Sequence, residues 1–307
     1  MELGKFLRNL FSFQEERERI GLALGGGGAR GLAHLGVLQA LEERSFSLDQ
    51  IVGTSMGAIV GGAYAQGAKV EELIARFADY QRLYGDQQKE IERSLGVSPR
   101  NRFDRWTTSL SNYYFMLRGS NGNSLLDGDM LVEMTDFLLS ETEIGDTQIP
   151  FAAVAVDIIS GEELLLTEGP IREAVRASAS MPGIFPPVEW EGRFLLDGGV
   201  TNLVPVDDVF ALGADRVIAV DVGKEVDFNS LPNKGLDLLF RVSAIARHQL
   251  KLRHMEKADV IIRPEVEDFS WYDFSDYEEI IDRGRTATER AIADNEWLRE
   301  EKVRSPR

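Results

Sequence analysis

The stretch Ile51-Val52-Gly53-Thr54-Ser55-Met56-Gly57 decides the fold of this chain. Its apolar start predicts a short buried strand, and the small residues that continue beyond Gly57 at helical spacing predict a helix packed closely on a sheet. A Gly-x-Ser-x-Gly pattern at such a junction is typical of a sharp strand-to-helix turn that exposes the serine hydroxyl. Glycines relieve the crowding of that turn. Ser55 is therefore a candidate nucleophile, supported by Gly53 and Gly57.

A second strand–loop–helix unit comes earlier in the chain. Residues 20–24 predict a buried strand, residues 25–28 are four consecutive glycines, and Ala29-Arg30-Gly31 closes the loop before a leucine-patterned helix. Consecutive glycines before a helix leave backbone N–H groups free to face an anion. A serine nucleophile creates an oxyanion that needs such donors. The two units together predict a nucleophile beside an oxyanion-binding loop.

Strand and helix patterns alternate through most of the chain. Strands are expected at 151–156, 163–166, 194–196, 217–220 and 260–262, and helices at 71–80, 171–178, 206–212, 236–257 and 277–299. This alternation predicts an α/β fold with a mostly parallel central sheet covered by helices on both faces, in three layers. Sites in such sheets lie at the carboxyl ends of strands. We expect a catalytic domain over 20–225 and a C-terminal helical part at 226–307 that completes the same fold.

Two segments stand apart from this alternation. Residues 1–19 repeat Phe and Leu at roughly helical spacing, which predicts an amphipathic segment that either docks on the protein body or lies in a membrane interface. Residues 81–123 set aromatic side chains among charged and polar ones. They are interpreted either as a satellite helical hairpin with its own small core or as a mobile lid that lines an acyl-chain groove.

Composition narrows the class of protein. The chain has 307 residues, a formal net charge of −17, three histidines and no cysteine. The acidic balance argues against a nucleic-acid partner, and the absence of cysteine excludes thiolate metal sites and disulfides. No apolar run approaches the roughly 20 residues that span a bilayer. Charged residues at 15–19 stand where a signal-peptide cleavage site would be, so we expect a cytoplasmic protein with a possible peripheral membrane contact.

The base that would activate Ser55 is less obvious than the nucleophile. His248 and His254 fall six residues apart in a long charged helix, unlike a triad loop, and His34 is expected to pack under the glycine loop. A carboxylate remains as the candidate. Asp197 ends a strand-like run and precedes two glycines, so it is either an ordinary Asp-Gly turn or a general base within reach of the serine.

Four blocks in this order resemble the bacterial branch of the patatin-like phospholipase family: residues 25–31, 53–57, 177–188 and Asp197-Gly198-Gly199. The resemblance implies a Ser–Asp dyad lipid acyl hydrolase that needs no metal or cofactor. Ser55 would be the nucleophile and Asp197 the base. The amides of Gly26, Gly27 and Gly28 would form the oxyanion hole. The supporting positions would be Arg30, Gly53, Gly57, Gly198 and Gly199. The partner implied is a lipid or acyl ester substrate.

Two other classes of function stay open at this point. The glycine loop could bind the phosphates of a nucleotide. However, no Gly-Lys-Ser/Thr follows the loop, and the dinucleotide-binding pattern Gly-x-Gly-x-x-Gly with a later acidic residue fits it less well than the oxyanion-loop interpretation. An intact site could also serve acyl transfer or protein regulation, since a fold does not fix a function. Lipid class, acyl-chain preference and oligomeric state are left open by the sequence.

Overall fold

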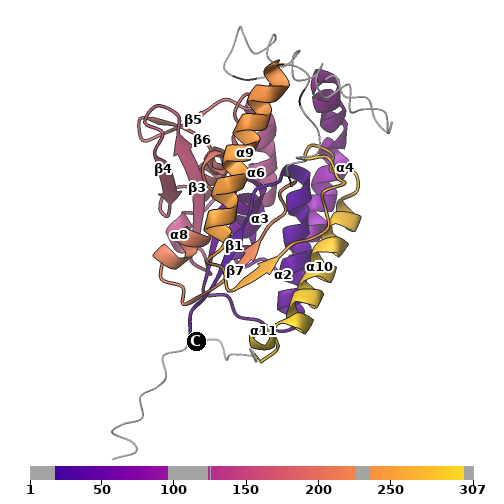
Figure 1. Ribbon diagram of the computed structural model, residues 1–307. Coiled ribbons are helices and arrows are strands. Elements are labelled where there is room, and N and C mark those ends of the chain that lie inside the picture. Colours follow the sequence, from indigo (N-terminus) through magenta and orange to yellow (C-terminus); the bar gives the residue numbers. More distant parts are fainter. Residues whose placement is uncertain (1–17, 96–123, 125, 226–231, 233–234, 301–307) are drawn as a thin grey trace, which may run out of the picture.

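The central sheet of the computed structural model carries eight strands, and helices lie against both of its faces (Figure 1). The structure describes residues 18–95, 124, 126–225, 232 and 235–300. The strands are β1 (Ile20–Leu24), β2 (Gln50–Thr54), β3 (Phe151–Asp157), β4 (Glu163–Leu166), β5 (Val188–Trp190), β6 (Arg193–Asp197), β7 (Arg216–Val220) and β8 (Val260–Ile262).

The helices connect these strands. The α-helices are α2 (Ala33–Glu43), α3 (Met56–Ala65), α4 (Val70–Leu95), α6 (Asp129–Leu138), α7 (Ile171–Ala179), α8 (Val206–Ala211), α9 (Gly235–Met255), α10 (Tyr277–Asp294) and α11 (Glu296–Glu300). Short 3-10 turns are η1 (Gly28–Leu32), η3 (Ile144–Asp146) and η4 (Gly198–Val200). The predicted α/β class is confirmed.

The strand order is β5-β6-β3-β2-β1-β7-β8, with β4 also paired to β3. β3, β2, β1, β7 and β8 run parallel to one another, whereas β4 and β6 pair antiparallel with β3 and β5 pairs antiparallel with β6. The register opposes Thr54 to Val154 on β3, and the next residue of β3, Ala155, to Asp197 on β6. An antiparallel strand therefore delivers Asp197 to the level at which β2 ends.

Side chains that alternate along each strand pack into two separate hydrophobic cores. Leu22 and Leu24 of β1 belong to the larger core, which α2, α3, α4, α6, α7 and α10 share. Ala23 points the other way, into a smaller core closed by α8 and by Met255 at the end of α9. This period of two in a strand with both faces covered explains why β1 and β2 are buried at every position.

Sequence expectations and structure differ mainly in the connecting regions. The helix expected from residue 71 to 80 continues to Leu95 as α4, and α6 and β5 were not predicted. β5 has three residues, too few for a periodic signal. Residues 1–17 and 96–123 lie outside the described residues, so the amphipathic segment, the lid alternative and the division into 1–19, 20–225 and 226–307 stay predictions.

Candidate active site

Ser55 occupies the turn between β2 and α3. Its backbone angles, φ 56° and ψ −122°, fall in a region that non-glycine residues rarely adopt. The Ser55 amide donates a 3.0 Å hydrogen bond to the Oγ of Ser178 on α7, which ties the turn to a second helix. A Cβ on Gly57 would collide with the carbonyl oxygen of Leu24, so only glycine lets α3 approach β1 this closely.

Asp197 ends β6 and faces Ser55. Its amide donates to the Ser180 carbonyl at 2.9 Å, and its Oδ1 accepts the Gly199 amide at 2.8 Å. The Ser55 hydroxyl also lies close enough to its carboxylate to act on it. Burial raises the pKa of Asp197 to about 6, while the Ser55 hydroxyl, the Gly199 amide and the Arg247 charge oppose that rise. The structure thus joins two predicted residues from distant parts of the chain.

The glycine loop passes directly beside Ser55, because a Cβ on Gly26 would lie 3.1 Å from the Ser55 Cβ. The Gly26 amide donates to the Leu203 carbonyl at 2.9 Å, and the Ala29 amide donates to the Trp271 carbonyl at 2.6 Å. The expectation that Gly26 donates to an oxyanion is therefore wrong, since its N–H is already committed to the backbone. In the described part of the chain, the amides of Gly27 and Gly28 have no backbone acceptor.

Gly53 and Gly198, two more of the predicted supporting positions, are sites of close approach. A Cβ on Gly53 would lie 2.5 Å from the Ala58 Cα, and a Cβ on Gly198 would lie 2.5 Å from the Val154 carbonyl oxygen. The first contact keeps the serine turn tight. The second lets the turn after Asp197 lie flat on β3. A side chain at either position would push the Ser55 turn away from the Asp197 turn.

Arg30 belongs to the glycine-loop segment, and His34 packs against it. Burial lowers the pKa of the Arg30 guanidinium, opposed by the charges of Glu267 and Asp221, and its Nε has no hydrogen-bond partner among the described residues. The fully buried His34 donates from Nε2 to the Gly25 carbonyl at 2.7 Å, and burial lowers its pKa to about 4. Its predicted packing role is confirmed, because a neutral imidazole bound to that carbonyl does not reach Ser55.

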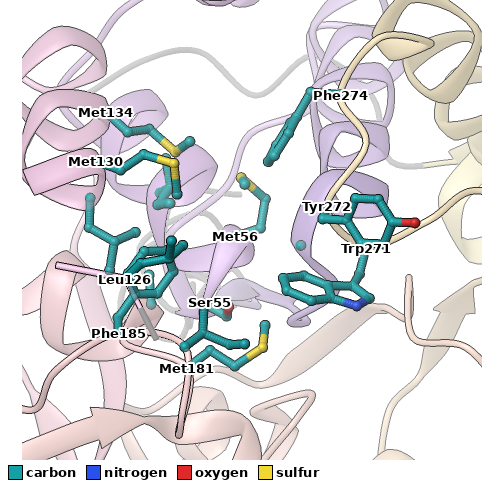
Figure 2. Close-up of a pocket in the computed structure, with 15 residues that line it drawn as sticks. Ser55, Met56, Leu126, Met130, Met134, Met181, Phe185, Trp271, Tyr272 and Phe274 are labelled. Atoms are coloured by element: carbon teal, nitrogen blue, oxygen red, sulfur yellow. The ribbon is translucent and has the colours of Figure 1, made fainter. Parts of the chain in front are cut away.

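An apolar pocket of about 530 Å³, part of it open to solvent, lies above Ser55. Figure 2 shows Ser55 at its base, with Met181 and Phe185 on one side and Trp271 on the other. The pocket is lined mostly by carbon and sulfur, as small-molecule binding sites usually are. Its shape and lining suit an aliphatic chain attached to a group that reacts at Ser55.

Sequence reasoning missed most of this lining. Met130 and Met134 come from α6, and Trp271, Tyr272 and Phe274 come from the loop after β8. The available signal was weak, because methionines four residues apart on a helix occur equally in an ordinary core. Most of the segment expected to line an acyl groove, 81–123, lies outside the described residues, so that expectation stays a prediction.

Neither metal binding nor membrane crossing has a visible structural basis in the described residues. No group of three or more His, Asp or Glu side chains there is placed to hold a metal ion. None of the helices searched, all in the described part of the chain, is long and apolar enough to cross a bilayer.

Comparison with known proteins identifies the family. An uncharacterized NTE family protein of Mycobacterium bovis is 34% identical over 204 residues, which cover 66% of this chain and 49% of that protein. Lysophospholipase NTE1 of Candida glabrata is 32% identical over 86% of this chain and 15% of its own length. The chain thus spans about half of the first relative and a small part of the second.

Among solved structures, VipD of Legionella pneumophila aligns with 91% of this chain and 67% of its own chain, at 16% identity and a TM-score of 0.46. The model of the patatin-like phospholipase family matches residues 22–210, a span that contains the serine turn, the glycine loop and Asp197. That span exceeds half of the 307 residues. The chain therefore belongs to the patatin-like phospholipase family.

Proposed function

We propose that this chain hydrolyses carboxylic esters of lipids through a covalent acyl-enzyme formed on Ser55. The observation that carries the proposal is the close approach of the Ser55 hydroxyl to the buried carboxylate of Asp197, beside an apolar pocket that Ser55 lines. A serine hydroxyl needs a base within hydrogen-bond reach to become a nucleophile. Family membership and the lysophospholipase relatives support the same class of substrate.

In the acylation step, Ser55 Oγ attacks the ester carbonyl carbon while Asp197 takes the hydroxyl proton. The pKa of Asp197, about 6, leaves the carboxylate mostly ionised at neutral pH and yet able to hold a proton during the step. The negative carbonyl oxygen is held by the amides of Gly27 and Gly28. When the tetrahedral intermediate collapses, Asp197 returns the proton to the departing alcohol and the acyl group stays on Ser55.

Deacylation repeats these roles with water. Asp197 removes a proton from the water that attacks the acyl carbonyl, and the same two amides hold the second oxyanion. Asp197 then returns the proton to Ser55 Oγ as the fatty acid leaves. An acceptor alcohol in place of water would make the same site an acyltransferase, the alternative that fold alone leaves open.

A lipid with one acyl chain is the substrate that we infer first. The described pocket offers one continuous apolar surface leading to Ser55, which suits a single chain. Relatives at about 30% identity are named lysophospholipases, and that name supports the same choice. Lysophospholipid, diacyl phospholipid and monoacylglycerol should therefore be compared at equal concentration, with release of free fatty acid as the readout.

The first test is Ser55→Ala in the full chain. We expect the variant to lose fatty-acid release and labelling by a serine-directed fluorophosphonate, because no other group would form the acyl-enzyme. Ser140→Ala is a matched control, because Ser140 is an exposed serine outside the site. Full labelling of a folded Ser55→Ala protein would place the nucleophile elsewhere. Transfer of the acyl group to glycerol in preference to water would favour the acyltransferase alternative.

A further inference from the structure

The solvent face of α9 is apolar, which is the reverse of an ordinary surface helix. Five of the ten large apolar side chains that are exposed among the described residues lie on this one helix, at exposures between 37% and 66%. They are Leu238, Leu239, Val242, Ile245 and Leu252. At 100° per residue, four of them fall within about 80° of one another, and Leu239 lies beside this stripe. The helix thus presents an apolar ridge outward over residues 238–245, with Leu252 further along, beyond the exposed Gln249.

The C-terminal end of α9 is fixed to the protein body by its inner face. Lys251 and Met255 are only 4% and 1% exposed, and Lys251 Nζ lies 2.8 Å from Asp221 Oδ2. Figure 1 shows α9, in orange, in front of the sheet with no other helix between it and the viewer. The apolar ridge is therefore not buried against the protein body. Only an external surface could remove the ridge from contact with water.

The charge of this segment is opposite to that of the whole chain. Helix α9 holds Arg241, Arg247 and Arg253 besides the buried, ion-paired Lys251, and one acidic residue, Asp237, in a chain whose net charge is −17. A helix with apolar residues on its outer face and basic residues around them has the composition of an interfacial helix on an anionic bilayer. Residues 1–17, another possible cover, carry three basic and three acidic side chains and offer no complementary charge.

We propose that α9 docks the protein on an anionic lipid surface, with Leu239, Val242 and Ile245 inserted among the lipid headgroups. The helix passes close enough to the site for the Arg247 charge to act on Asp197, and Lys251 joins it to the strand end beside the glycine loop. Docking through this face holds the site at the surface from which a lipid is drawn. The proposal rests on the proposed function for its lipid substrate, and binding can be measured without hydrolysis.

The test measures sedimentation of the full chain with vesicles of phosphatidylcholine containing about a third phosphatidylserine. Leu239→Gln/Val242→Gln removes two exposed apolar side chains and keeps good helix formers. We expect at least tenfold weaker binding, the factor that follows from two partly inserted side chains. The matched control, Val242→Ile/Ile245→Val, keeps the ridge apolar and should bind as the unchanged protein does. Vesicles of phosphatidylcholine alone should bind several-fold less.

A second readout separates this proposal from the proposed function. Both variants should cleave a soluble short-chain ester at the normal rate, because the substituted side chains face away from Ser55. Normal vesicle binding by Leu239→Gln/Val242→Gln would overturn the docking role while leaving the hydrolase intact. A change in oligomeric state with no change in vesicle binding would also overturn it, since the ridge would then join two copies of the chain. Loss of ester cleavage in Ser55→Ala bears only on the proposed function.

Discussion

Two aspartates at strand ends, Asp197 and Asp221, share nearly the same backbone setting. Asp197 ends β6 and accepts the Gly199 amide at 2.8 Å, and Asp221 follows β7 and accepts the Gly223 amide at 3.0 Å. Their exposures are 6% and 5%. In each case the carboxylate turns back on the amide two residues ahead, the usual geometry of an Asx turn.

The two carboxylates differ in which further groups lie next to them. Asp221 contacts the Lys251 ammonium at 2.8 Å and lies 3.7 Å from the Arg263 guanidinium, so its charge is neutralised by direct ion pairs. Asp197 instead meets the neutral Ser55 hydroxyl and has only the longer-range charge of Arg247. A buried carboxylate without a contacting cation keeps its affinity for a proton. The comparison teaches that the partner, and not the turn or the burial, separates a candidate base from a structural charge.

Among these substitutions, Asp197→Asn should change kcat the most. The amide keeps the shape of the side chain but cannot accept the Ser55 proton, so kcat should fall by roughly 10²–10⁴. The same variant should be more stable at pH 7.5, by up to about 3 kcal/mol, because the native pKa of about 6 lies above the unfolded value. The loss of stability builds up as the pH rises from the unfolded pKa of about 4 to the native pKa of about 6, and it is complete above that value.

Two measurements check this pair of effects. Fatty-acid release gives kcat, and thermal unfolding at pH 7.5 and at pH 4 gives the stability change. The gain in melting temperature should shrink at pH 4, where Asp197 is protonated in the native protein. A variant with lost activity and lowered stability at pH 7.5 would mean that Asp197 is a structural charge like Asp221.

Gly27→Ala tests the loop that lies between the two aspartates. An added Cβ would lie 2.8 Å from Val222 Cγ2, the side chain that follows Asp221, and would displace the loop. Loss of one oxyanion donor should lower kcat by roughly 10²–10³. Gly145→Ala is the matched control, because a Cβ there meets nothing within 4 Å. Near-normal turnover of Gly27→Ala would mean that the donors come from another segment.

The pH dependence sharpens the assignment of the base. Asp197 must be ionised to accept a proton, so kcat/KM on a soluble ester should decline about tenfold for each pH unit below about 6. His34 has a pKa of about 4 and stays neutral through that range, so it cannot produce the same inflection. A profile that stays flat down to pH 4.5 would contradict a raised Asp197 pKa.

Asp221→Asn should have the smallest effect on rate and a large effect on stability. The substitution leaves the buried Lys251 charge without its main partner, which typically lowers the free energy of unfolding by about 3–5 kcal/mol. The rate of the folded enzyme should change less than tenfold. Asp221→Asn/Lys251→Met removes both charges and should recover most of the stability. A rate loss comparable to that of Asp197→Asn would show that Asp221 takes part in the chemistry.

The sequence predicted the parts of the site that are made by local chain geometry. A serine between glycines at a strand–helix junction predicts its own sharp turn, and the φ of 56° at Ser55 follows from that pattern. The alternation of apolar runs and helical stripes likewise predicted the class of sheet. These properties depend on residues within a few positions of each other, so they can be read without knowledge of the fold.

Other parts could not be predicted because they depend on contacts between distant segments. The lining by α6 and the loop after β8 comes from elements more than 60 residues away from Ser55. The use of the Gly26 amide by Leu203 is a pairing across 177 residues, and the glycine pattern carries no sign of it. The apolar ridge of α9 could not be predicted either. The sequence indicates a long helix, but it does not show which face of that helix packs on the protein body.

By itself, then, the sequence determined the serine turn, the glycine loop and the α/β class, because turn chemistry and side-chain periodicity are local. Only the tertiary structure placed Asp197 beside Ser55. A rule for parallel sheets would not place it, because β6 runs antiparallel to β3. The register of that pair brings Asp197 level with the end of β2, and its burial without a contacting cation then raises its pKa. Both depend on which strands pair, a choice made by the packing of the whole chain.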